Sequence, residues 1–136
     1  MQEKIDILSD TITDYSLDIK PNDRVLITYQ SSECHPLVKT LIRKITEKKG
    51  ICFTKFVDAE IEALLNSLTS DERIKCHRNL REYEVNNYDC FITICYSTND
   101  YITRNIKSEI RSKMLLATTD LDAIRTNERR WVLFGL

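Results

Sequence analysis

The stretch SSECHP, Ser31 to Pro36, places a thiol beside an imidazole at the expected start of a helix. The partial positive charge at a helix N-terminus lowers a thiol pKa and favours the thiolate, so Cys34 is a candidate nucleophile. Adjacent residues of a helix point about 100° apart. His35 therefore cannot serve as the base, and His77 from another segment would have to do so. The alternative, which we favour, is that Ser31 or Ser32 caps the helix and Cys34 is incidental.

A second Cys–His pair, Cys76 and His77, lies inside a helical segment. Zinc sites need ligand spacings such as CxxC or HxxxH, because two donors must reach one ion. Neither pair has such a spacing, and the chain contains only two histidines. We therefore predict no catalytic residue and no metal ligand within residues 1–136.

Ligands of parallel α/β proteins bind at the carboxyl ends of the strands. Asp58 follows the second expected strand, where a ribose-binding carboxylate would lie. A dinucleotide site also needs a glycine turn after the first strand, and the two glycines, Gly50 and Gly135, lie elsewhere. The sequence therefore argues against nicotinamide, flavin and Walker-type phosphate binding.

The remaining polar residues favour structural roles. Tyr96, Ser97 and Asp100 follow the third strand and could line a cleft, although capping of the next helix by Asn99 or Asp100 is the favoured role. Arg129 and Arg130 could bind an anion, but we expect them to flank the last strand in solvent. Most carboxylates are expected on solvent faces of helices: Glu33, Glu47, Glu62, Glu72, Glu82 and Glu109.

Composition limits the classes of partner. The 136 residues carry 20 basic and 21 acidic side chains, a net charge of −1, without a basic tract for nucleic acid. No apolar run approaches the ~20 residues of a membrane span, and the N-terminus lacks a signal-peptide core. We expect a cytoplasmic protein, whose five cysteines are reduced thiols.

The elements that must position these residues alternate between helix and strand. An amphipathic helix is expected over Glu3–Ser16, with Ile5, Leu8, Ile12 and Tyr15 on one face. A second helix over Pro36–Lys49 turns Leu37, Leu41, Ile42 and Ile45 inward and ends at Gly50, a left-handed C′ residue. Strands are expected at about 24–30, 51–57, 89–96 and 131–136.

Further helices separate the last three strands. One over Ala59–Leu68 has Ile61, Leu64, Leu65 and Leu68 on one side, and Ser70 caps the next, which reaches about Glu84. Ile102 to Met114 marks another, and a break at Thr118–Thr119 precedes a last helix over Leu121–Arg130. Alternation of this kind predicts a three-layer α/β sandwich, with a mostly parallel sheet of about four strands. Residues 1–136 are expected to form a single domain.

The order of these segments resembles the start of the thermophilic-type metalloaminopeptidases, such as aminopeptidase S, aminopeptidase T and the leucyl aminopeptidase-like enzymes. FVDAEI resembles the family's second-strand ending with its acidic residue, and RRWVLFGL resembles its arginine–tryptophan strand segment. Asn22 departs from the glycine that is usual there. The residues that stand at matching places include Pro21, Asp23, Val25, Ile27, Pro36, Leu37 and Gly50.

The resemblance implies that the chain is the non-catalytic N-terminal domain of an aminopeptidase about three times longer. A C-terminal catalytic domain would hold a pair of zinc, cobalt or manganese ions, which activate water against the amino-terminal peptide bond. The resemblance maps none of the ligands onto residues 1–136, so this chain alone is expected to be inactive. The implied partners are that domain and peptide substrates, and a homodimer is left open. Two alternatives are a self-contained binding or regulatory domain and a thiol enzyme using Cys34.

Overall fold

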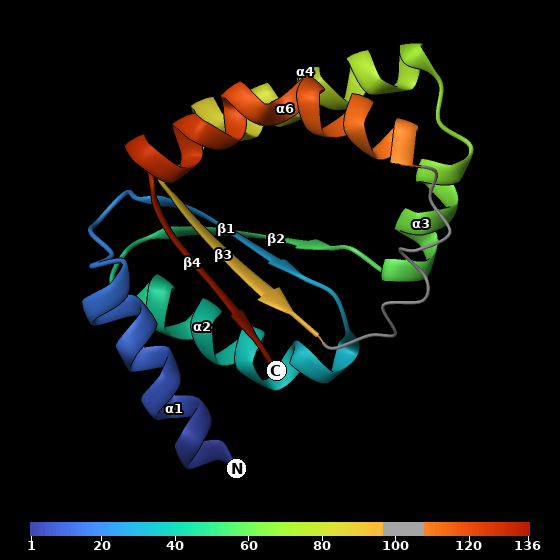
Figure 1. The fold of residues 1–136 in the computed structure, drawn as a ribbon. Helices are drawn as coiled ribbons and strands as arrows, with labels where there is room; N and C mark the ends of the chain where they lie inside the picture. Colours follow the sequence, from blue (N-terminus) through green and yellow to red (C-terminus); the bar gives the residue numbers. More distant parts are fainter. Residues whose placement is uncertain (97–107) are drawn as a thin grey trace. The chain divides into compact units, whose positions relative to one another are not determined.

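Four strands of six residues form one parallel sheet in the order β2-β1-β3-β4. In this computed structural model, which describes residues 1–96 and 108–136, they are β1 (Arg24–Tyr29), β2 (Ile51–Phe56), β3 (Cys90–Cys95) and β4 (Arg130–Gly135) (Figure 1). Each predicted strand is confirmed to within one residue at either end. The α/β class and the parallel sheet are confirmed, consistent with a three-layer α/β fold.

The chain divides into two compact units, which we call the sheet unit and the helical unit. The sheet unit comprises Met1–Phe56, Tyr88–Ser97 and Arg129–Leu136. The helical unit comprises Val57–Asn87 and Thr98–Glu128. Since the chain passes repeatedly between them, the sheet unit is built from three separate segments.

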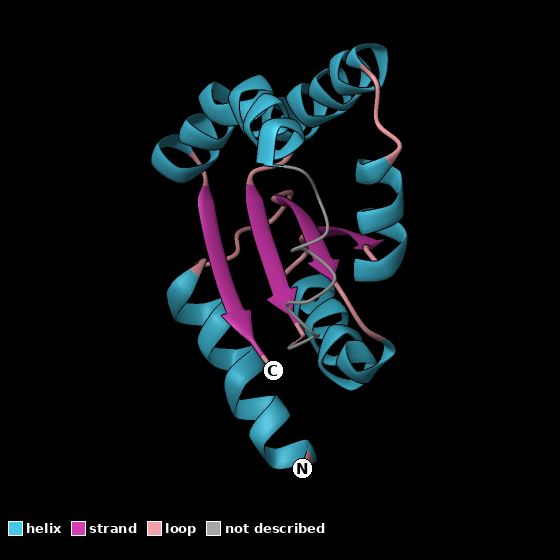
Figure 2. Cartoon of the chain, turned by 45° about the vertical axis from the view of Figure 1, so that its right-hand side comes forward, coloured by secondary structure: helices cyan, strands magenta, loops and turns pink. Residues whose placement is uncertain are grey.

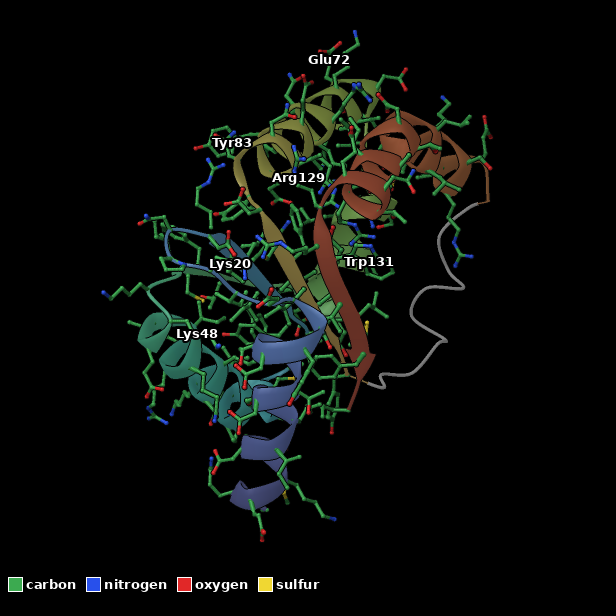
Figure 3. All side chains as sticks on the ribbon, turned by 90° about the vertical axis from the view of Figure 1, so that its left-hand side faces the viewer. Lys20, Lys48, Glu72, Tyr83, Arg129 and Trp131 are labelled. Atoms are coloured by element: carbon green, nitrogen blue, oxygen red, sulfur yellow. The ribbon has the colours of Figure 1, made fainter. Side chains whose placement is uncertain are left out.

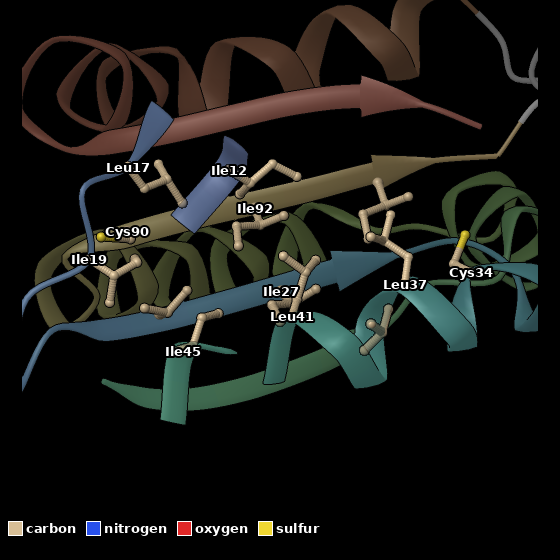
Figure 4. Packing of buried hydrophobic residues seen from close by; sticks show 13 residues of the cluster. Ile12, Leu17, Ile19, Ile27, Cys34, Leu37, Leu41, Ile45, Cys90 and Ile92 are labelled. Carbon is tan, nitrogen blue, oxygen red and sulfur yellow. The ribbon is translucent and has the colours of Figure 1, made fainter. Parts of the chain in front are cut away.

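The sheet unit contains α1 (Gln2–Asp10), a π-helical turn η1 (Thr11–Ser16) and α2 (His35–Glu47), which Figure 2 shows together with the strands. The apolar side chains of these helices and of the strands form one core. The central strands β1 and β3 supply Val25, Ile27, Ile92 and Ile94, all fully buried. Leu41 and Ile45 of α2 meet them from the helix side (Figure 4). The predicted inward residues of α2 are confirmed, with Ile42 only partly buried.

The predicted first helix is confirmed, but its apolar face is wrong at Tyr15. The Leu17 N–H donates to the Ile12 carbonyl at 2.9 Å, an i→i+5 bond that widens the turn. This wider turn buries Ile12, Thr13 and Leu17. Tyr15 is left 83% exposed, because its predicted position assumed an uninterrupted α-helical period.

The left-handed residue after α2 is Lys49, with φ 66°, and the prediction of Gly50 for this role is wrong. Gly50 is required for a different reason, since a Cβ there would lie 2.7 Å from Cγ2 of Ile45 and 3.2 Å from Cγ2 of Ile19. Asn22 is also left-handed, with φ 70°, in the predicted turn before β1.

Two ion pairs connect the N-terminal helical segment, residues 2–16, with the last turn and the end of α2. Lys44 pairs with Asp10, and Lys48 pairs with Asp14. Lys48 projects from the end of α2, as Figure 3 shows. The salt bridges thus reinforce the apolar contact between these elements.

A network of side chains joins the amino ends of three strands. Arg24 of β1 and Asp89 before β3 bond through the backbone N–H of Arg24 at 2.8 Å and its guanidinium at 3.3 Å. Arg130 of β4 pairs with Asp23 at 2.7 Å and donates to the carbonyls of Leu17 and Asp18 at 3.0 Å. The prediction of a solvated Arg130 is therefore wrong, because the strand start brings it to these acceptors.

The helical unit contains α3 (Ala59–Ser67), α4 (Asp71–Asn87) and α6 (Ser108–Glu128). Ser70 caps α4 as predicted, since its Oγ accepts from the Arg73 N–H at 3.1 Å. Helices α4 and α6 pack together, and Arg78 forms a two-pronged salt bridge with Asp120 at 2.7 and 2.8 Å. Hydrogen bonding from Arg78 lowers the pKa of Asp120 to about 2.

The predicted break at Thr118–Thr119 is wrong, and the helix predicted from Ile102 lies partly outside the described residues. Helix α6 runs through Thr118–Thr119 without the predicted break. The Thr119 hydroxyl donates back to the Leu115 carbonyl at 2.6 Å, a bond that a threonine inside a helix can make. The apolar side chains of α3 do share one side of the helix, but all four are exposed: Ile61, Leu64, Leu65 and Leu68.

Candidate functional site at the carboxyl end of the sheet

The strand order places a topological switch point between β1 and β3. From β1 the chain moves to β2 on one side, and it then returns to β3 on the other. Ligands of open α/β sheets bind outside the strand ends at such a point. A hydrogen bond connects the carboxyl ends of β1 and β3, because the Tyr96 N–H after β3 donates to Oε1 of Gln30 after β1 at 3.2 Å. Gln30 and Tyr96 are both half-buried at this edge.

An aromatic cluster lies beside the switch point. Tyr29 and Phe56 end the neighbouring strands in register, and their rings meet edge to face with centroids 5.1 Å apart. His35 completes the cluster, with its Nε2 3.3 Å from the Tyr29 hydroxyl and its ring centroid 6.5 Å from that of Phe56. The cluster offers apolar ring surface together with a hydroxyl and an imidazole for hydrogen bonding. It was missed from the sequence, although aromatic residues ending two successive strands are a usable signal.

Cys34 lies at the start of α2, as predicted, but its side chain is fully buried. Burial raises the pKa of the Cys34 thiol, which opposes formation of the thiolate. The capping alternative is confirmed only in part, because Oγ of Ser31 accepts from the Glu33 N–H at 3.2 Å and caps the 3-10 turn η2 (Ser32–Cys34) that leads into α2. Helix α2 itself has no side-chain cap. Cys34 therefore acts as a packing residue of the sheet unit, which weakens the thiol-enzyme hypothesis.

The five cysteines are free thiols with different environments. Burial raises the pKa of Cys90 to about 12 and that of Cys52 to about 11, whereas Cys76 is exposed on α4. We expect native protein treated with iodoacetamide at neutral pH to be alkylated first at Cys76. Peptide mass spectrometry over time measures this, with Cys76→Ser as the control that loses the fast phase. Alkylation of Cys34 at the rate of Cys76 would contradict the burial argument.

The other candidate residues are placed as follows. Asp58 caps α3, because its Oδ1 accepts from the N–H groups of Glu60 and Ile61 at 2.9 and 3.0 Å. Cys76 and His77 both lie on α4, in the helical unit. Ser97, Asn99 and Asp100 lie outside the described residues. Among residues 1–96 and 108–136, no group of three or more His, Cys, Asp or Glu side chains is arranged to hold a metal ion.

A pocket of about 340 Å³ opens at the same end of the sheet unit. Its walls are Ile5 and Leu8 of α1, Pro36 and Leu37 of α2, and the terminal residues Met1 and Leu136. Lys4 and Glu33 add one charge of each sign. The pocket lies within the volume range of small-molecule sites, and its lining suits an apolar group.

No described helix combines the length and the apolar character that a membrane crossing requires. This finding concerns only residues 1–96 and 108–136.

Comparison with known proteins finds a likeness of fold. No protein-family profile matches the chain, and no curated protein sequence matches it. Among solved structures, wild-type AmpT from Thermus thermophilus is similar, with a TM-score of 0.67 and 13% sequence identity. The likeness covers 99% of this chain but 36% of AmpT, so the chain spans about a third of that protein's length.

Proposed function

We propose that this chain is the non-catalytic N-terminal α/β domain of a metal-dependent aminopeptidase. The observation that carries the proposal is the likeness to AmpT, a thermophilic aminopeptidase, over 99% of this chain and only 36% of AmpT. Because the family resemblance places none of the metal ligands within residues 1–136, this domain is expected to lack the reacting groups. The sequence resemblance described above points to the same assignment.

Under this proposal the hydrolytic chemistry belongs to a second domain of the same chain. That domain would hold a pair of zinc, cobalt or manganese ions and would cleave the N-terminal residue from peptides. The sheet unit and the helical unit would pack against it and help to wall the substrate chamber or form a subunit contact. The aromatic cluster of Tyr29, His35 and Phe56 would serve as contact surface.

Activity measurements test whether residues 1–136 lack the catalytic groups. Purified residues 1–136 are assayed on aminoacyl-anilides with added zinc, cobalt or manganese, beside the product of the complete reading frame. We expect no turnover above the metal-only rate from residues 1–136, and metal-dependent turnover from the longer product. Robust turnover by residues 1–136 would show that the ligands are present in this chain.

The reading frame supplies a second test. A frame that stays open past the Leu136 codon and encodes Glu, His and Asp ligands supports the proposal. A stop codon directly after Leu136 would contradict it. That outcome would favour a self-contained binding domain, for which the 340 Å³ pocket lined by apolar side chains is the specific observation.

A further inference from the structure

The three described helices of the helical unit, α3, α4 and α6, line a second pocket, of about 290 Å³. It lies wholly within this unit, so it requires neither the sheet unit nor a catalytic domain. Its volume lies at the lower end of the range of small-molecule sites, so we expect a small ligand. Asn66 of α3, His77 of α4, and Arg111, Met114, Leu115 and Thr118 of α6 form its lining.

Several cations in the described part of the helical unit form ion pairs, whereas Arg111 of the pocket does not. Arg78 binds Asp120 at 2.7 Å, Arg81 binds Glu84 at 2.9 Å, and Lys113 lies 3.6 Å from Asp71. Within residues 1–96 and 108–136, the side chains of Arg111 and His77 have neither an ion pair nor a hydrogen bond. The pocket lining therefore holds a guanidinium and an imidazole but no acidic side chain.

Asn66 adds a third donor to the pocket. Its Oδ1 accepts from Nη1 of Arg73 at 3.3 Å, and Arg73 also reaches Oγ1 of Thr69 at 3.4 Å. With its oxygen engaged, the Asn66 amide presents its NH₂ group as a donor. Thr118 is turned to acceptors on its own helix, the Met114 carbonyl at 3.5 Å and Asp122 at 3.4 Å. Three donors thus remain for a ligand.

We propose that this pocket binds the carboxylate of a small molecule that carries an apolar group. The Arg111 guanidinium has the fork of N–H donors that matches a carboxylate, and His77 and Asn66 add further donors. Met114 and Leu115, of which Leu115 is 65% exposed, supply apolar surface for the rest of the ligand. A single guanidinium balances one negative charge, which favours a carboxylate over a doubly charged phosphate.

The two histidines make the binding measurable in the whole chain by carbon–proton correlation NMR. The probe is 4-methylpentanoate, the control ligand is its uncharged amide, and inorganic phosphate is titrated in parallel. We expect 4-methylpentanoate to shift the imidazole signal of His77 saturably. The signal of His35, which belongs to the sheet unit and contacts Tyr29, is the internal reference and should not move.

Arg111→Gln should weaken binding at least about tenfold, because hydrogen bonds to a charged group are lost. Arg111→Lys, which keeps the charge but not the fork, should weaken it less. Arg43→Gln removes an exposed arginine of α2 in the other unit and should leave the affinity unchanged. The proposal is overturned if the amide binds as tightly as the carboxylate, or if Arg43→Gln weakens binding as much as Arg111→Gln. It is also overturned if phosphate saturates His77 at a lower concentration.

Discussion

Replacing Ile45 by alanine is expected to lower the free energy of unfolding of the sheet unit by about 2–5 kcal/mol. Ile45 is fully buried on α2 and belongs to the cluster that includes Ile12, Ile19 and Leu41. Truncation would remove three carbons from a fully buried site, and the surrounding side chains are expected to fill the cavity only in part. Urea unfolding followed by tryptophan fluorescence measures the effect.

The fluorescence signal is specific for the sheet unit. The chain has one tryptophan, Trp131, and it lies on β4. The matched control is Ile7→Ala, the same change on α1 of the same unit, at a side chain that is 61% exposed. We expect this control to shift the free energy by no more than about 0.5 kcal/mol. Equal losses in the two variants would mean that Ile45 does not lie in a packed core.

Replacing Arg130 by methionine is expected to cost about 1.5–3 kcal/mol of unfolding free energy. Methionine keeps an apolar stem of comparable length but removes the donors to Asp23, Leu17 and Asp18. The Asp23 side chain is only 13% exposed, so its carboxylate would lose its charged partner in a largely buried place. The Arg130 side chain is 38% exposed, which places the expected loss toward the lower end of the range.

Urea unfolding followed by circular dichroism is the appropriate measurement here, because Trp131 is adjacent to the substitution. Arg130→Lys keeps the charge but offers fewer, less directed donors, so we expect an intermediate loss. Arg43→Met, at an exposed site on α2, is the control and should be close to neutral. A loss in Arg43→Met equal to that in Arg130→Met would contradict the assigned role of Arg130.

Most of the sheet could be predicted because its sequence signals are local. Strands β1 and β3 are nearly continuous apolar runs, as expected of central parallel strands, and turn residues precede β1. The strand order could not be predicted, because helix–strand alternation fixes the crossovers but not the neighbours of each strand. Pairing of β1 with β3 depends on contacts between residues that are far apart in the sequence.

The errors have physical causes in specific residues. Tyr15 was misplaced by a π-helical turn, which changes the period within one helix. Thr118 and Thr119 indicate a break by composition, yet their hydroxyls bond to carbonyls one turn earlier. Lys49 adopts the conformation that glycine favours, while Gly50 is needed for the approach of Ile45. In each case the deciding contact is invisible to residue type alone.

The candidate sites were harder to predict than the fold. The position of Cys34 at a helix start was correct, but its burial depends on side chains contributed by distant segments. The pocket of Asn66, His77 and Arg111 draws on three helices and has no compact motif. His77 was considered only as the partner of a thiol and as a possible zinc ligand, because its actual neighbours come from tertiary packing.

The three-segment construction of the sheet unit has a consequence for the order of folding. Strands β1 and β2 are joined by a short connection that contains α2, so they can pair early. The bond between Arg24 and Asp89 spans 65 residues, and that between Arg130 and Leu17 spans 113. Each doubling of a closed loop costs about 0.6 kcal/mol of chain entropy, and long-range contacts slow folding. During synthesis on the ribosome, the first elements to emerge would be α1, β1, α2 and β2. The edge of β1 that pairs with β3 would stay unpaired until residues 57–89 had been made and β3 followed.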